Sequence, residues 1–123
     1  MSLVVSIIAK DIYIEIEEIE NEIESSYSDS LGSERWREEL WGHSIMKSIG
    51  CDMIYELNVK NVYAFDEDIS KLEIEFNKIM ENIELISYLT KIKTEAIEFR
   101  VRNALEAIRV AQKHSDKVGV ALW

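Results

Sequence analysis

Residues 69–86 read ISKLEIEFNKIMENIELI, and residues 97–111 read IEFRVRNALEAIRVA. Apolar side chains recur in both stretches at the spacing of an amphipathic helix. The two apolar stripes consist of Ile69, Leu72, Phe76, Ile79, Ile83 and Ile86, and of Ile97, Val101, Ala104, Ile108 and Ala111. A single rod through both would be about 69 Å long at 1.5 Å per residue, which exceeds a domain of this size. We therefore predict an antiparallel helical hairpin that turns between residues 87 and 94.

Short apolar segments on either side of this hairpin have the composition of β-strands. Residues 3–9, LVVSIIA, predict a strand that is buried on both faces. Residues 51–57 and 59–65 alternate in polarity and predict a β-hairpin. Residues 118–123, VGVALW, predict a last strand, which could pair with the first. The order of elements predicts an α+β fold, in which a small sheet of about four strands packs against amphipathic helices, and the length suits a single domain, 1–123.

The segment before the predicted β-hairpin contains a loop and a helix. Residues 25–33, SSYSDSLGS, predict a loop. Residues 34–49 predict a helix that ends at Gly50, a residue able to adopt the left-handed conformation. Trp41 lies on one apolar side of this helix and Trp36 on another. Such a helix is either enclosed in the core or presents one side to a partner.

Residues 11–24, DIYIEIEEIENEIE, form what we call the acidic segment, and it contains no Lys or Arg. Its six glutamates are Glu15, Glu17, Glu18, Glu20, Glu22 and Glu24. A helical reading aligns Ile12, Ile16, Ile19 and Ile23 on one stripe, whereas a strand reading aligns isoleucines only as far as Ile16. We predict a helix over residues 11–25 with the acids facing outward.

The negative charge of the chain is concentrated near this segment. Residues 1–34 carry nine acids against Lys10 alone, whereas residues 35–123 carry fifteen acids and thirteen bases, giving a net charge of −10 overall. One interpretation is a solvated face that keeps the protein soluble. The other is a binding surface, in which the repulsion between neighbouring acids is retained because the acids attract a positively charged partner.

Residues with the potential for catalysis are few. Cys51 and His43 are the only candidate thiol and imidazole pair, and no signature of a nucleophile surrounds them. Asp66, Glu67 and Asp68 lack the glycine and spaced oxygen ligands of a calcium loop, and we interpret them as acids at the start of a helix. We therefore expect no enzyme activity, no cofactor and no metal site.

The composition also bears on location and partners. A single cysteine cannot form an intramolecular disulfide, and a reducing compartment, the cytoplasm, is the expected location. No secretory pattern and no apolar stretch of about 20 residues is present, so we expect no membrane association. The acidic charge argues against direct binding of nucleic acid.

In its size, acidity and α+β build, the chain resembles the immunity proteins of bacterial contact-dependent inhibition and related polymorphic toxin systems. The resemblance extends over the whole chain, and no motif carries it. It implies a protein that binds and neutralises a basic toxin domain, most simply a nuclease. The expected contact surface consists of Glu15, Glu17, Glu18, Glu20, Glu22 and Glu24, with Asp29 beside it and Trp36 as an anchor.

Two alternatives belong to other classes. The first is a self-assembling or adaptor protein, a homodimer for example, in which the acidic segment of one copy meets the basic helix at residues 91–113 of another. The same two regions could instead pair within one chain. The second alternative is an enzyme that uses Cys51.

Overall fold

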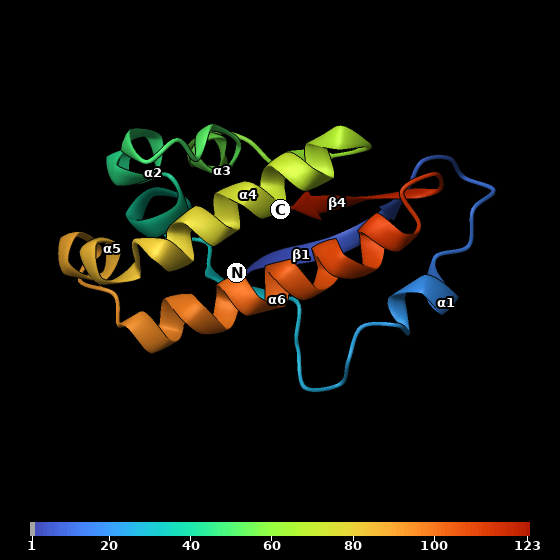
Figure 1. Ribbon diagram of the computed structural model, residues 1–123, viewed down its shortest axis with the longest axis horizontal. Helices are drawn as coiled ribbons and strands as arrows, with labels where there is room; N and C mark the ends of the chain where they lie inside the picture. The colour runs from blue at the N-terminus through green and yellow to red at the C-terminus, as the bar shows by residue number, and fades with distance from the viewer. Residues whose placement is uncertain (1) are drawn as a thin grey trace.

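The computed structural model describes residues 2–123 and has two layers, an antiparallel sheet and a layer of helices (Figure 1). The sheet has four strands in the spatial order β2-β1-β4-β3. They are β1 (Ser2–Ala9), β2 (Ser30–Ser33), β3 (Val62–Ala64) and β4 (Val118–Leu122). The predicted α+β fold with a small sheet is confirmed.

Strands β1 and β4 form the centre of the sheet, as predicted for the two ends of the chain. Their register runs from Val5 opposite Leu122 to Ala9 opposite Val118. Leu3, Val5 and Ile7 are buried beneath the helices, whereas the alternate side chains of β1 are only partly buried or exposed. The prediction that β1 is buried on both faces is wrong, because the helices cover one face of the sheet only.

The predicted helical hairpin is present, and it packs over the sheet. It consists of α4 (Glu67–Glu81), α5 (Ile83–Thr90) and α6 (Thr94–Lys113), with the turn at residues 91–93. The first arm is interrupted at Asn82, whose side-chain amide donates a hydrogen bond to the carbonyl of Lys78 at 2.8 Å. A side chain that bonds to the backbone in this way competes with the regular helix.

The predicted helix over residues 34–49 is divided into two short helices. The first is a π-helix, η1 (Arg37–Trp41), and the second is α2 (Ser44–Ser48). Gly42 lies between them with no room for a side chain, because a Cβ there would be 2.5 Å from Cβ of Asn58. This close approach of two backbones, which only glycine permits, breaks the helix.

The predicted β-hairpin over residues 51–65 is also wrong. Residues 51–57 form part of α3 (Asp52–Tyr55) and of a 3₁₀ turn, η2 (Glu56–Asn58), and only β3 is a strand. Gly50 has φ 87°, which confirms the predicted left-handed end before this region. Within the predicted loop 25–33, the last four residues form β2 instead.

A buried carboxylate on α4 explains why α3 is helical. Glu75 is 7% exposed, and its carboxylate accepts hydrogen bonds from the backbone N–H groups of Ile54 at 2.9 Å and Met53 at 3.2 Å. These N–H groups at the start of a helix have no partner within the helix itself. Glu75 therefore caps α3 from a distant element, and its burial raises the pKa of this carboxyl.

Candidate protein-binding surface

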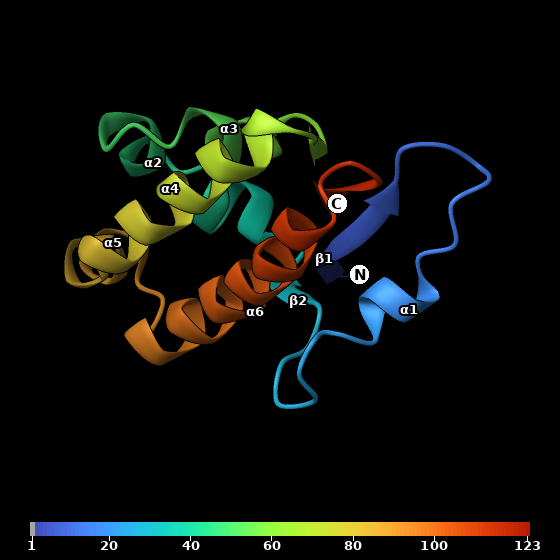
Figure 2. The ribbon, with the colours of Figure 1, turned by 45° about the vertical axis from the view of Figure 1, so that its right-hand side comes forward.

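The acidic segment leaves the end of β1 and projects beyond the two layers (Figures 1 and 2). Only one turn of it is helical, α1 (Glu17–Glu20), so the predicted helix over residues 11–25 is wrong. Like charges three and four residues apart oppose a helix, and no base in the segment relieves them. Ile19 is buried, and Ile16 and Ile23 pack against the core.

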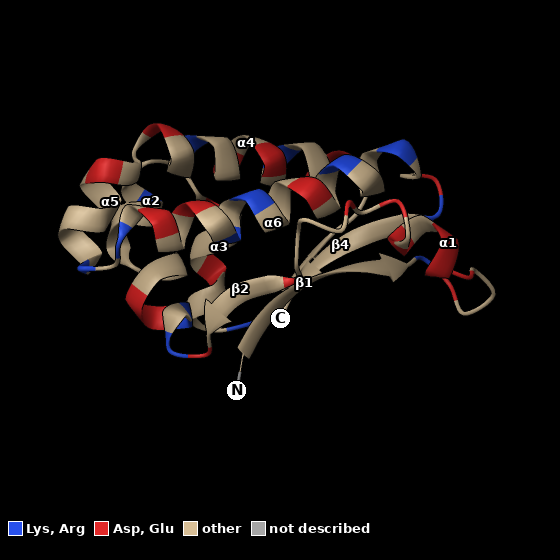
Figure 3. Cartoon of the chain, turned by 90° about the horizontal axis from the view of Figure 1, so that it is seen from below, with Lys and Arg blue, Asp and Glu red and all other residues tan. Residues whose placement is uncertain are grey.

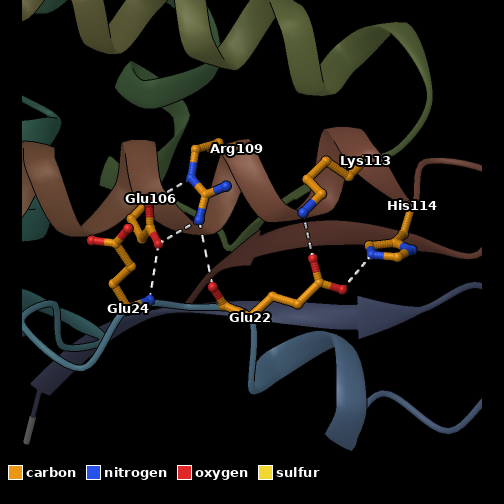
Figure 4. A network of polar contacts seen from close by, with 6 residues as sticks. All are labelled: Glu22, Glu24, Glu106, Arg109, Lys113 and His114. Carbon is orange, nitrogen blue, oxygen red and sulfur yellow. Dashed lines mark hydrogen bonds and ion pairs between the residues drawn. The ribbon is translucent and has the colours of Figure 1, made fainter.

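Glu22 attaches the acidic segment to the end of α6 (Figure 4). Its carboxylate lies 2.7 Å from Nζ of Lys113 and 2.6 Å from Nε2 of His114. Hydrogen bonds first from Lys113 and then from His114 hold the pKa of Glu22 below its usual value. Through Glu22, the acidic segment thus pairs with the basic end of α6 within one chain.

A second attachment lies about two turns earlier on α6. Glu106 is 6% exposed, and its carboxylate accepts hydrogen bonds from the backbone N–H of Glu24 at 3.0 Å and from Nε of Arg109 at 2.8 Å. The Arg109 guanidinium lowers the pKa of Glu106. It also donates to the carbonyl of Glu22 at 3.4 Å, so the second half of the acidic segment is held at several points (Figure 4).

The other glutamates of the acidic segment remain exposed. Within residues 2–123, no Lys, Arg or His lies within 4.0 Å of their carboxylates. They are Glu15, Glu17, Glu18, Glu20 and Glu24. Asp29 is exposed as well and borders the same hollow as Glu20 and Glu24. Five glutamates and Asp29 therefore form an acidic surface that makes no ion pair within residues 2–123, part of it visible around α1 in Figure 3.

Two large apolar side chains stand at the start of this acidic surface. Ile12 is 90% exposed and Tyr13 is 88% exposed, the two highest values among the large apolar residues of the described chain. The backbone N–H of Tyr13 donates to the carboxylate of Asp11 at 2.8 Å, which fixes a turn at this point. Sequence reasoning assigned Ile12 to the apolar stripe of a helix and missed this pair. Asp11, a residue typical of such turns, was the available signal.

Trp36 does not join the acidic surface through its contacts. Its ring packs against Gly32, lies 6.4 Å from the ring of Trp41, and has the guanidinium of Arg100 at 5.2 Å. None of these neighbours belongs to the acidic segment. Trp36 is partly buried and helps to join β2 to α6.

The residues considered for catalysis are held by contacts within the fold. Cys51 is fully buried, its thiol donates to the carbonyl of Glu75 at 3.3 Å, and burial raises its pKa to about 12. Nδ1 of His43 accepts a hydrogen bond from the backbone N–H of Ile45, which caps α2. Glu67 and Asp68 lie in the first turn of α4, as predicted, and Asp66 pairs with Lys10 at 2.6 Å. Within residues 2–123, no group of three or more potential ligands could hold a metal ion.

No family model, curated protein or solved structure matches this chain. Among the helices of residues 2–123, none combines the length and the apolar character needed to cross a membrane.

Acid is expected to release the acidic segment before the rest of the fold loosens. The pKa values of Glu22 and Glu106 are both lowered from 4.5, so their attachment is complete above that pH and is lost as the pH falls below it. Glu75 has a raised pKa and contributes in the opposite direction. Amide-exchange protection should therefore fall at residues 22–29 while α4 remains protected.

The control for this acid release is a variant with Glu22→Gln and Glu106→Gln. It should show weak protection at residues 22–29 at every pH, with little further change on acidification. Equal loss of protection in α4 and in residues 22–29 of the wild type would contradict the expectation.

The thiol of Cys51 is expected to resist modification in the folded protein at neutral pH. A thiol with a pKa of about 12 forms very little thiolate, which is the reactive species. A disulfide reagent should therefore label Cys51 only as fast as the protein unfolds. Adding Ser70→Cys, at an exposed position of α4, should introduce one rapidly labelled thiol. Rapid labelling of the wild type would revive the hypothesis of a reactive cysteine.

Proposed function

We propose that this chain is a small immunity protein that binds and neutralises a basic toxin domain, most simply a nuclease. The observation that carries the proposal is the projecting acidic surface, in which Glu15, Glu17, Glu18, Glu20 and Glu24 are exposed and unpaired within residues 2–123. A nuclease must bind phosphates, so its groove is positively charged and complements such a surface.

The attachment to α6 supports this proposal. A partner that binds a flexible segment must also order it, and that ordering reduces the affinity. Here the contacts of Glu22 and Glu106 hold the second half of the acidic segment before any partner arrives. The part of the acidic surface near Glu24 is therefore preorganised for binding, and the burial of Ile19 positions α1.

Ile12 and Tyr13 supply apolar contact area, which an acidic surface alone lacks. Charges at an interface mainly accelerate association and select the partner, whereas buried aromatic and aliphatic side chains provide much of the affinity. The two exposed side chains adjoin Glu15 along the chain. We assign them to the contact surface as an apolar anchor, in place of Trp36.

The contacts also redefine the expected surface at one position. Glu22 is occupied by Lys113 and His114 within the same chain, so it acts as an attachment rather than as a contact. This internal pairing removes the need for the acidic segment of one copy to meet α6 of another. Cytoplasmic location remains part of the proposal, and a buried, unpaired cysteine is compatible with a reducing compartment.

Capture of the partner tests the proposal. The tagged protein is immobilised, lysate of its source cells is passed over it, and bound proteins are eluted with increasing salt and identified by mass spectrometry. The proposal expects one basic protein in stoichiometric amount, toxic when expressed alone and harmless when co-expressed. An immobilised variant with Glu15→Gln, Glu17→Gln and Glu18→Gln should not retain this basic protein. A partner retained equally by that variant, or no toxic partner at all, would contradict the proposal.

A further inference from the structure

Strand β3 lies at an edge of the sheet, and the backbone groups of Tyr63 face away from the neighbouring strand. Successive residues of a strand direct their N–H and C=O groups to opposite edges. Val4 of β1 and Trp123 exchange both backbone hydrogen bonds, at 2.9 and 3.0 Å, so every second residue back from Trp123 bonds to β1 and the residues between bond to β3. Tyr63 lies opposite Ala121, which bonds to β1. The N–H and C=O of Tyr63 therefore point outward from the sheet.

The other edge of the sheet, β2, is occupied by side chains of the same chain. The indole N–H of Trp41 donates to the C=O of Leu31 at 2.9 Å, and the side-chain amide of Asn103 donates to the C=O of Ser30 at 3.0 Å. Within residues 2–123, no side chain or backbone group does the same for the N–H and C=O of Tyr63. An edge with unpaired backbone groups can pair with a further strand.

A hollow of about 630 Å³ lies beside β3 and opens to solvent. Its walls come from β3, from α3 and η2, and from the first turns of α4. Met53 of α3 lines it and is partly buried. The charged residues that line it are paired with one another, Lys60 with Glu56 at 3.0 Å and Lys71 with Asp68 at 3.6 Å. Because these charges offset each other, the hollow suits uncharged side chains.

Arg37 holds the segment that precedes β3 in place. Its guanidinium donates to the C=O groups of Leu57 and Lys60, both at 3.2 Å, and to the side-chain oxygen of Asn61 at 2.6 Å. This wall of the hollow is therefore fixed within the chain itself. A site that is already ordered loses less affinity to ordering when another chain binds.

We propose that β3 and this hollow bind an extended, uncharged segment of another protein, which adds to the four-stranded sheet as a further strand. The backbone of Tyr63 identifies the occupant. An extended chain can accept from its N–H and donate to its C=O, whereas a helix has used its own backbone groups internally. Side chains of the added strand alternate between the two faces, so those on the helical side enter the hollow beside Met53.

None of the four strands of a second copy fits this description. Strands β1 and β4 are central, and the edge of β2 is occupied. Strand β3 of a second copy could pair through its own Tyr63, but its helix-side residues Val62 and Ala64 are 5% and 0% exposed beneath that copy's helices. Their side chains are not available to enter the hollow. The occupant is therefore a segment of a different protein.

Selection from a phage-displayed library of random linear peptides against the full chain supplies the probe. The enriched peptides are synthesised and titrated by fluorescence anisotropy. At saturation they should slow hydrogen exchange of the Tyr63 amide about tenfold or more, because this N–H becomes part of a sheet. Failure to enrich any peptide, or binding that leaves exchange of the Tyr63 amide unchanged, would overturn the proposal.

A matched pair of substitutions tests recognition through the backbone. Tyr63→Pro removes the outward N–H at an edge position, where a sheet tolerates proline, and Tyr63→Ala removes the same ring but keeps the N–H. Tyr63→Pro should bind the peptides at least about tenfold more weakly than Tyr63→Ala, because the peptide C=O loses its donor. Equal affinity of the two variants would show that the peptides bind elsewhere. Circular dichroism and urea unfolding first establish that both variants fold, and the exchange measurement on the wild type decides if Tyr63→Pro does not.

Sedimentation of the wild type and of Tyr63→Pro tests a second copy as the occupant. A wild type that stays monomeric while it binds the peptides supports assignment of the edge to another protein. Self-association of the wild type that Tyr63→Pro abolishes would assign the edge to a second copy and overturn the proposal. None of these measurements uses a toxin, so their outcome is separate from that of the proposed immunity function.

Discussion

Replacing Trp41 with alanine is expected to lower the free energy of unfolding by about 3–5 kcal/mol, the usual range for removing a large aromatic side chain from a core. Trp41 is fully buried at the end of η1. Its ring lies edge-to-face with Phe76 of α4, with centroids 6.0 Å apart, and its indole N–H donates to the carbonyl of Leu31 at 2.9 Å. The substitution therefore leaves both a cavity and a buried carbonyl that has lost a donor.

Urea unfolding followed by far-ultraviolet circular dichroism measures this loss. Trp41→Phe is the informative comparison, since it retains most of the aromatic volume but removes the hydrogen bond to Leu31. Trp41→Phe should lower the free energy of unfolding by less than Trp41→Ala does. Trp36→Ala, at a partly buried position, should also lower it by less than Trp41→Ala does. A loss for Trp41→Ala no greater than that for Trp36→Ala would show that the core does not depend on this contact.

The elements that sequence predicts well are those whose local apolar period agrees with their packing in the fold. The apolar stripe from Ile97 to Ala111 lies against the sheet and α4, and α6 is one uninterrupted helix. Strand β4 is likewise a continuous apolar run, and its pairing with β1 follows from burial. In these segments, local periodicity and tertiary packing favour the same structure.

The elements that sequence misassigns depend on contacts from distant parts of the chain. Residues 51–57 alternate like a strand, yet the carboxylate of Glu75, more than twenty residues away, caps them as a helix. Gly42 breaks the predicted helix because Asn58 lies against it. No local pattern contains these contacts, so propensity is overridden by tertiary structure.

The charge of the candidate surface was predictable from the sequence, but its backbone conformation and its attachment to α6 were not. The exposed glutamates and Asp29 follow from the concentration of acids in residues 1–34. The attachment of Glu22 to Lys113 and His114 requires the end of α6 to lie beside the acidic segment, which sequence offered only as one alternative. The exposure of Ile12 and Tyr13 follows from the projecting turn and contradicts the helical stripe.

Neutralising three exposed glutamates, by Glu15→Gln, Glu17→Gln and Glu18→Gln, is expected to slow association with the captured basic partner about tenfold or more at low salt. Electrostatic steering raises association rates by about 10-fold to 1,000-fold, and these carboxylates have no basic neighbour within residues 2–123 that already offsets them. The fold should be retained, because all three side chains are exposed. Stopped-flow or surface-based kinetics over a series of salt concentrations gives the association rate.

The matched control neutralises Glu81, Glu84 and Glu95, which are exposed near α5, at the opposite end of the molecule from α1 (Figure 1). It changes the net charge equally, so it separates local steering from the effect of total charge. The control should associate nearly as fast as the wild type, and the difference between the two variants should shrink at high salt, because screening lengths fall from about 10 Å at 0.1 M to about 3 Å at 1 M. Equal slowing by both variants would mean that total charge, rather than the acidic surface, directs association, and the contact would then have to be sought around another part of the fold.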